Sequence, residues 1–190
     1  MGYGTAFRAC DKLNLMHTIK IALSFLLLLV VTAGPAAAVE KQTYTSKLFL
    51  YSIDYPADWR VKEISKVAMF LSPLESRQDK FAENVEVNVE DLSQAGNVSL
   101  IDYHRKSIGA ATRMLKDFKV LEEAKTEFIG REAIAVLYTA VVKEKLFRFK
   151  KVTLIVGKDA YSLTYNALSD DFEKYLPQAE KIMRSLQVSP

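Results

Sequence analysis

A single histidine, His104, could support acid–base or metal chemistry in the part of this sequence that we expect to fold. The only other histidine, His17, precedes the predicted domain. Any Ser-His-Asp catalysis would therefore need His104, yet no Gly-x-Ser-x-Gly turn supplies a nucleophile. His104 lies between Ile101 and Ile108 on an apolar helical stripe, which is typical of a partly buried structural histidine. These residues predict a protein that is not an enzyme.

Two groups of acidic residues have oxygen atoms that could bind a hard cation. The first group shares one face of a predicted strand and consists of Glu86, Asn88 and Glu90. The second group begins the last predicted helix and consists of Asp170, Asp171 and Glu173. A polar strand face in water explains the first group, and the positive end of a helix explains the second. A cation at the first group would need further ligands from a loop. We therefore expect no cofactor and no metal, and weak Ca²⁺ or Mn²⁺ binding stays open.

Basic and aromatic residues alternate along one predicted hairpin. They are Lys143, Lys145, Phe147, Arg148, Phe149, Lys150 and Lys151. Arg148 and Lys150 share one strand face, and Phe147 and Phe149 share the other. The favoured interpretation is an ordinary hairpin whose charges protect a sheet edge. The alternative is a docking patch for an acidic protein partner or for anionic lipid headgroups.

Eight segments have the apolar alternation that is typical of strands. We expect these strands to position most of the candidate site residues. They are residues 48–55, 59–61, 67–71, 84–91, 119–128, 131–142, 146–156 and 161–167. Residues 84–91 alternate most clearly, with Val85, Val87 and Val89 on one face. Residues 133–142 are apolar on both faces, which predicts a central strand that is covered on both sides.

Two helices complete the pattern. Ser99 is the predicted N-cap of the first, with Asp102 completing an approximate capping box. Its apolar stripe consists of Ile101, His104, Ile108, Ala111, Leu115 and Phe118. In the last segment Pro177 predicts an interruption, with 170–175 as a separate turn and Pro177 in the first turn of the main helix. Short links between strands favour an antiparallel sheet. The fold class is therefore α+β, a mainly antiparallel sheet sandwiched between helices.

The apolar run from Ile21 to Gly34 has the layout of a secretory signal peptide. Lys20 precedes it, and Ala36 and Ala38 follow it in an A-x-A arrangement. The run is shorter than the roughly 20 residues that cross a bilayer as a helix, so we expect cleavage, after Ala38.

The export signal divides the chain into two parts. Residues 1–38 are predicted to be an N-terminal extension plus signal peptide, with Met16 as a better start than Met1, and residues 39–190 a single globular domain. The only cysteine, Cys10, would be removed, which excludes disulfides and thiolate chemistry. The chain carries 26 Lys+Arg and 23 Asp+Glu, and three basic residues and one acidic residue precede Val39. Such a balanced domain lacks the basic footprint that nucleic acid requires.

Several motifs together resemble the PsbP-like domains, named for the extrinsic P subunit of photosystem II. They are the F-x-Y-x-I-x-Y-P-x-x-W run from Phe49 to Trp59, N-V-x-V-x-V at 84–89, the closing strand at 161–167, and the helix with Phe172, Pro177 and residues 182–186. The resemblance implies an antiparallel sheet between helices and an extracytoplasmic location. Members in photosynthetic organisms bind the lumenal side of photosystem II and help to retain its inorganic cofactors or assist assembly. The matching residues are core and turn positions, so the resemblance transfers no functional residue.

These observations predict an exported, non-enzymatic accessory or assembly domain that binds another extracytoplasmic or membrane-associated protein. The expected location is the bacterial periplasm or the extracellular space, or the thylakoid lumen if the organism is photosynthetic. We expect a monomer that does not bind nucleic acid and that can contact a membrane surface. The alternative is a module that holds a small apolar ligand or lipid between sheet and helix; an exported hydrolase is the weakest hypothesis.

Overall fold

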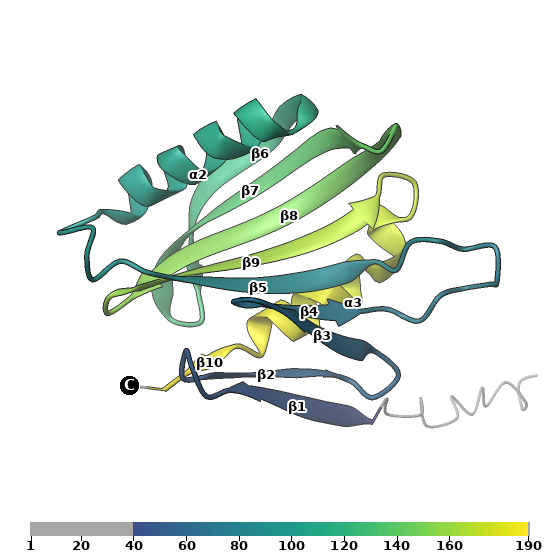
Figure 1. Cartoon of the computed structure of the whole chain (residues 1–190), viewed down its shortest axis with the longest axis horizontal. Helices are drawn as coiled ribbons and strands as arrows, with labels where there is room; N and C mark the ends of the chain where they lie inside the picture. The colour runs from purple at the N-terminus through teal and green to yellow at the C-terminus, as the bar shows by residue number, and fades with distance from the viewer. Residues whose placement is uncertain (1–39, 190) are drawn as a thin grey trace, which may run out of the picture. The chain divides into compact units, whose positions relative to one another are not determined.

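A computed structural model describes residues 40–189, so the predicted signal peptide and its cleavage site lie outside the described residues (Figure 1). Within this range the helices are α2 (Leu100–Met114) and α3 (Phe172–Arg184). The strands are β1 (Lys41–Ser46), β2 (Tyr51–Pro56), β3 (Arg60–Ile64), β4 (Val67–Leu71), β5 (Asn84–Asp91), β6 (Lys116–Phe128), β7 (Arg131–Val142), β8 (Lys145–Val156), β9 (Asp159–Leu168) and β10 (Gln187–Val188). No helix in this range is long and apolar enough to cross a membrane.

The strands form two antiparallel sheets. A seven-stranded sheet has the order β3-β4-β5-β9-β8-β7-β6, and a three-stranded sheet has the order β1-β2-β10. Tight turns explain why β6, β7 and β8 pair with their neighbours in sequence. Ile129-Gly130 and Lys143-Glu144 all have positive φ, between 48° and 72°, as the two-residue turns that match strand twist require. The mainly antiparallel α+β prediction is confirmed, whereas the separate small sheet was not predicted.

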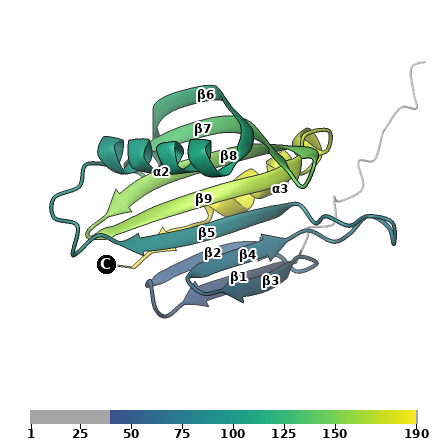
Figure 2. The same ribbon diagram turned by 45° about the horizontal axis from the view of Figure 1, so that its top comes forward.

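The two helices pack against side chains on opposite faces of the seven-stranded sheet. α3 contributes Phe172, Ala179, Ile182 and Met183 to a core that also contains the inward valines of β5. The three-stranded sheet packs into the same core. α2 lies over Val136, Tyr138, Phe147 and Phe149, which alternate with the residues of the first face (Figure 2). We call these two surfaces of the sheet the α3 face and the α2 face.

The prediction that 133–142 forms the central strand is wrong. β9 occupies the middle of the seven-stranded order, and β7 lies next to the edge strand β6. β7 is nevertheless apolar on both faces because α2 covers Val136 and Tyr138, while Ala133 belongs to the core on the α3 face. Apolar residues on both faces of a strand therefore indicate that both faces are buried. They do not indicate where the strand lies in the strand order.

The helix boundaries also differ from those predicted. α3 is one continuous helix from Phe172 to Arg184 with Pro177 inside it, so the predicted separate turn is wrong. Loss of one backbone hydrogen bond at Pro177 is tolerated because the apolar stripe around it is buried. α2 ends at Met114, and Phe118 lies in β6 although it continues the helical spacing. The Ser99 cap is confirmed, since its Oγ accepts a hydrogen bond from the backbone N–H of Asp102 at 3.1 Å.

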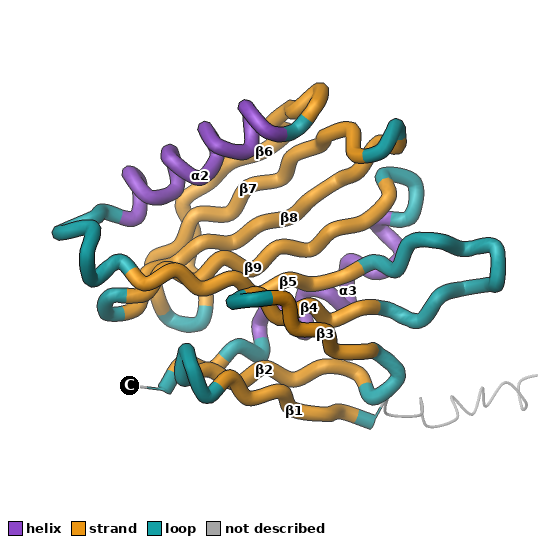
Figure 3. Tube along the Cα trace, in the orientation of Figure 1, coloured by secondary structure: helices purple, strands orange, loops and turns teal. Residues whose placement is uncertain are grey.

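The segment before β2 differs from the sequence prediction, whereas the segment before β5 agrees with it. β1 was not predicted, and the strand expected at 48–55 begins only at Tyr51. Residues 72–83 form the expected polar loop between β4 and β5 (Figure 3).

Candidate functional site

A groove lies on the α3 face of the seven-stranded sheet. It consists of two adjoining hollows, of about 150 Å³ and about 300 Å³, between α3 and the strands β6, β7 and β8. The hollows share Ala135 and Lys150. We call the two hollows together the α3 groove. Its floor contains Ala124, Ala135, Leu137 and Val152, and its helical wall contains Glu173, Leu176, Glu180 and Arg184.

Small side chains make the floor concave. Ala124 of β6 lies opposite Ala135 of β7, and Ala135 lies opposite Val152 of β8, so the three side chains form a row across the α3 face. α3 packs mainly over β5, β9 and β2 and reaches β8 through side-chain ion pairs, so it leaves this row partly uncovered. Alanine fills little volume in a close-packed interior, so the row opens space beside the helix.

Two cations of β8 connect the floor to the helical wall. Arg148 Nη1 donates to Glu173 Oε1 at 2.9 Å, and Lys150 pairs with Glu180. The Arg148 guanidinium also lies over the Phe172 ring, 4.5 Å from its centroid. Its Nε is buried and has no hydrogen-bond partner. Among residues 40–189, Glu173 alone accepts a hydrogen bond from this guanidinium.

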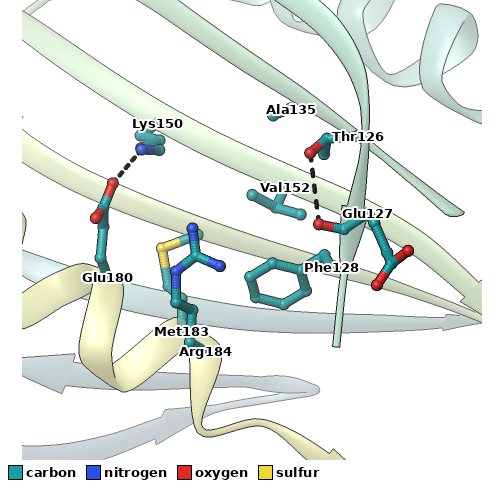
Figure 4. Close-up of a pocket in the computed structure, with 9 residues that line it drawn as sticks. All are labelled: Thr126, Glu127, Phe128, Ala135, Lys150, Val152, Glu180, Met183 and Arg184. Carbon is teal, nitrogen blue, oxygen red and sulfur yellow. Dashed lines mark hydrogen bonds and ion pairs between the residues drawn. The ribbon is translucent and has the colours of Figure 1, made fainter. Parts of the chain in front are cut away.

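Arg184 supplies a third cation at the other end of the groove. Figure 4 shows its side chain extending from α3 toward the strands, next to Met183, with Phe128 to its right in this view. Arg184 forms no ion pair with any other residue in the range 40–189. Arg184 was not predicted as a site residue, because the helix dipole already explains a basic residue in the last turn of a helix.

The structure divides the seven residues of the predicted docking patch between three places. Arg148 and Lys150 line the α3 groove. Phe147 and Phe149 are only 7% and 9% exposed and belong to the core under α2. The remaining basic residues are Lys143 and Lys145, which are exposed at the β7–β8 turn, and Lys151, which faces α2.

The polar residues under α2 form a second cluster. Lys151 Nζ donates to Ser107 Oγ at 2.5 Å, and burial lowers the pKa of Lys151. Tyr103 donates to Glu90 Oε2 at 2.9 Å; burial first, and then this carboxylate, raise the pKa of Tyr103 to about 12. Burial also raises the pKa of Glu86 on the same strand face. Glu90 is therefore a partner of α2, whereas Asn84 of the same strand accepts a hydrogen bond from Asn166 of β9.

His104 is buried on α2 and lies beside one carboxylate, that of Glu123. It is 4% exposed, and its Nε2 lies 3.3 Å from Glu123 Oε2 without forming a hydrogen bond. Thr153 Oγ1 and Ser162 Oγ are also buried without a partner. In residues 40–189 no three His, Cys, Asp or Glu side chains are grouped to hold a metal ion.

The acidic residues at the start of α3 have a role that was not predicted. Asp171 is the N-cap but forms no side-chain hydrogen bond to the helix. Glu173 pairs instead with Arg148 across the groove, so the helix dipole is only part of its explanation.

No family model and no curated protein matches the chain. Many solved structures are similar to it, and they include the following three. Cyanobacterial PsbP (CyanoP) from Synechocystis is 14% identical, with 84% of this chain and 99% of that chain covered and a TM-score of 0.59. LpqN of Mycobacterium tuberculosis, which is involved in cell envelope biogenesis, is 16% identical, with 80% and 91% covered and a TM-score of 0.59. The Ran-binding protein Mog1p of Saccharomyces cerevisiae is 8% identical, with 80% and 96% covered and a TM-score of 0.55.

At these identities the similarity shows the fold alone. The described chain has a PsbP-like fold, as the sequence motifs indicated.

Proposed function

We propose that residues 39–190 form a single exported, non-enzymatic domain, an α/β/α sandwich of the PsbP-like type, that acts by binding an extracytoplasmic or membrane-associated protein. One similar structure is a Ran-binding protein and another is involved in cell envelope biogenesis, which supports a binding role near a membrane. Cleavage of the signal peptide after Ala38 would deliver the domain to the periplasm or outside the cell, or to the thylakoid lumen in a photosynthetic organism.

The observation that carries this proposal is the contrast between the closed core and the open α3 groove. The core beneath α3 is tightly packed, with Phe172, Ile182 and Met183 at most 2% exposed. The groove beside it is lined by charged side chains from both the sheet and the helix. Charge complementarity along an open groove suits a protein partner better than a fully enclosed small molecule.

Two residues of the predicted docking patch, Arg148 and Lys150, lie in the groove and are part of the proposed binding surface. Arg148 and Lys150 contact the partner, and Lys143 and Lys145 at the adjoining turn extend the positive surface. The two phenylalanines and Lys151 support the surface from the α2 face.

Site-specific photo-cross-linking in the native host tests the proposal. A photoreactive residue at Leu176, in the groove, should capture a defined extracytoplasmic protein. The same residue at Arg105, which is exposed on α2, is the matched control and should not capture it. Capture of the same proteins from both positions, or no capture at Leu176, would contradict the proposal. N-terminal sequencing of the exported protein should recover Val39.

A small apolar or lipid ligand is the second candidate function. The observation that favours it is the hollow of about 300 Å³, whose lining includes Ala124, Leu137, Phe172 and Leu176. That volume is at the lower end of the range for ligand pockets. Native mass spectrometry of the protein purified from its host should then show a bound small molecule, and Ala135→Trp, which fills the floor, should remove it.

A further inference from the structure

We propose that the α3 groove binds an extended acidic segment of its partner, in which two carboxylate side chains are separated by one neutral residue. This inference rests on the proposed function and specifies the chemistry of the partner.

The spacing of the groove cations points to this pattern. Arg148 and Lys150 lie two residues apart on one face of β8. Residues i and i+2 of a strand are about 6–7 Å apart, and alternate side chains of any extended peptide have that same separation. Carboxylates at alternate positions of a bound peptide would therefore meet Arg148 and Lys150 in register, and a guanidinium can bind a carboxylate through two parallel N–H donors.

The cations are available because their internal partners are weakly held. The Glu173 side chain is 70% exposed, and within residues 40–189 Glu173 is the only acceptor for Arg148, which has five N–H donors. Lys150 and Glu180 are 31% and 35% exposed. Exposed ion pairs contribute between 0 and about 1 kcal/mol, so exchanging the exposed Glu173 carboxylate for one from a partner costs little.

The length of the groove also fits a short peptide. From Glu173 to Arg184 the helical wall runs for about 16 Å along its axis, which is roughly the length of five extended residues. The small side chains of Ala124 and Ala135 leave room for the neutral residue between the two acidic ones. Arg184, which has no ion pair in the described range, would accept a further carboxylate at the end of the segment.

Charge distribution favours a peptide over an acyl chain. Charged residues line both walls along the whole groove, and among them are Glu122, Arg148, Lys150, Glu173 and Glu180. An acyl chain in this position would bury those charges without replacing their hydrogen bonds, which is unfavourable. An extended peptide offers backbone N–H and C=O groups as well as its own carboxylates.

The test uses two blocked pentapeptides, Ac-TEVET-NH2 and Ac-TQVQT-NH2, titrated into the purified exported protein with NMR detection of backbone amides. We expect the glutamate peptide to shift amides of β8 and α3 and to bind at least tenfold more tightly than the glutamine peptide. Raising the salt concentration should weaken binding. Equal binding of both peptides, or no binding of the glutamate peptide, would overturn the proposal.

Matched variants locate the effect. The double variant Arg148→Gln, Lys150→Gln should lose at least tenfold in affinity. The double variant Lys62→Gln, Lys66→Gln removes the same charge from the exposed β3–β4 hairpin, outside the groove, and should stay within twofold. An equal loss of affinity in this control variant would overturn the proposal, and so would binding of dodecanoate but not of the glutamate peptide.

A gain of affinity provides a test that does not depend on damaging the groove. Glu173→Gln with Glu180→Gln removes the internal competitors and should tighten binding of the glutamate peptide severalfold; unchanged affinity would contradict the mechanism. If cross-linking at Leu176 captures a partner while the glutamate peptide does not bind, the proposed function stands and the acidic-segment inference fails.

Discussion

The two faces of the seven-stranded sheet are closed by different chemistry. On the α3 face, apolar side chains of helix and sheet interlock, and Ile182 and Met183 are each 2% exposed. On the α2 face, the helix buries only Tyr103 and His104, and polar groups such as Lys151 lie beneath it. The α3 face therefore holds the larger closed core, whereas the α2 face combines a smaller apolar cluster around Tyr138 and Phe149 with polar contacts.

The largest expected effect is a difference in unfolding free energy between the same substitution made in α3 and in α2. Ile182→Ala on α3 should cost about 2–5 kcal/mol of unfolding free energy, because it leaves a cavity in a closed core. Ile108→Ala on α2 should cost less than half as much, because Ile108 is only partly buried. Urea unfolding measures both, and equal losses would remove the distinction between the faces.

The next effect concerns the hydrogen bond that ties the start of α3 to the sheet. Tyr165 donates to the backbone C=O of Phe172 at 2.9 Å in a buried position. Tyr165→Phe should cost about 1–2 kcal/mol, because a buried acceptor loses its donor. Tyr55→Phe removes an exposed bond to Gln42 and should leave the melting temperature nearly unchanged. A larger effect at Tyr55 would contradict this account.

A smaller effect should reveal the polar character of the α2 face. Burial raises the pKa of Glu86, so the folded state disfavours its charged form and loses stability at pH values above that raised pKa. As the pH falls through the folded pKa toward the ordinary value, this penalty disappears. Glu86→Gln should therefore raise the melting temperature at pH 8 and have progressively less effect toward pH 4. A uniform effect across this range would argue against the titration of Glu86, and the exposed Glu122→Gln is the control.

The smallest expected effect is the coupling energy of the ion pair between Arg148 and Glu173 in the α3 groove. A double-mutant cycle of Arg148→Gln and Glu173→Gln should give a coupling energy below about 1 kcal/mol, because the Glu173 side chain is 70% exposed. A coupling above 2 kcal/mol, measured by thermal or urea unfolding, would mean that Glu173 is too firmly held for a partner carboxylate to replace it.

Local patterns predicted the regular elements well where one face of a strand is buried. β5 and β7 have the predicted bounds, and Ser99 caps α2 as expected. The errors occur where tertiary packing overrides a local rule. Pro177 remains inside α3 because that helix is buried, and β1 is stabilised by pairing with β2 although its own residues are mostly exposed.

The candidate site was only partly predictable for the same reason. The spacing of Arg148 and Lys150 on one strand face is visible in the sequence. Their glutamate partners lie 25 and 30 residues further along the chain. Arg184 and the row of small side chains at Ala124 and Ala135 join the site only when α3 is placed beside β6 and β7.

The sequence by itself determined most of the strand and helix types and the antiparallel hairpins, because these depend on periodicity and turn residues. Tertiary structure decided the strand order, the division into two sheets and the existence of the α3 groove. These depend on which faces cover one another, and no local pattern encodes the placement of a helix beside strands that are far away in the chain.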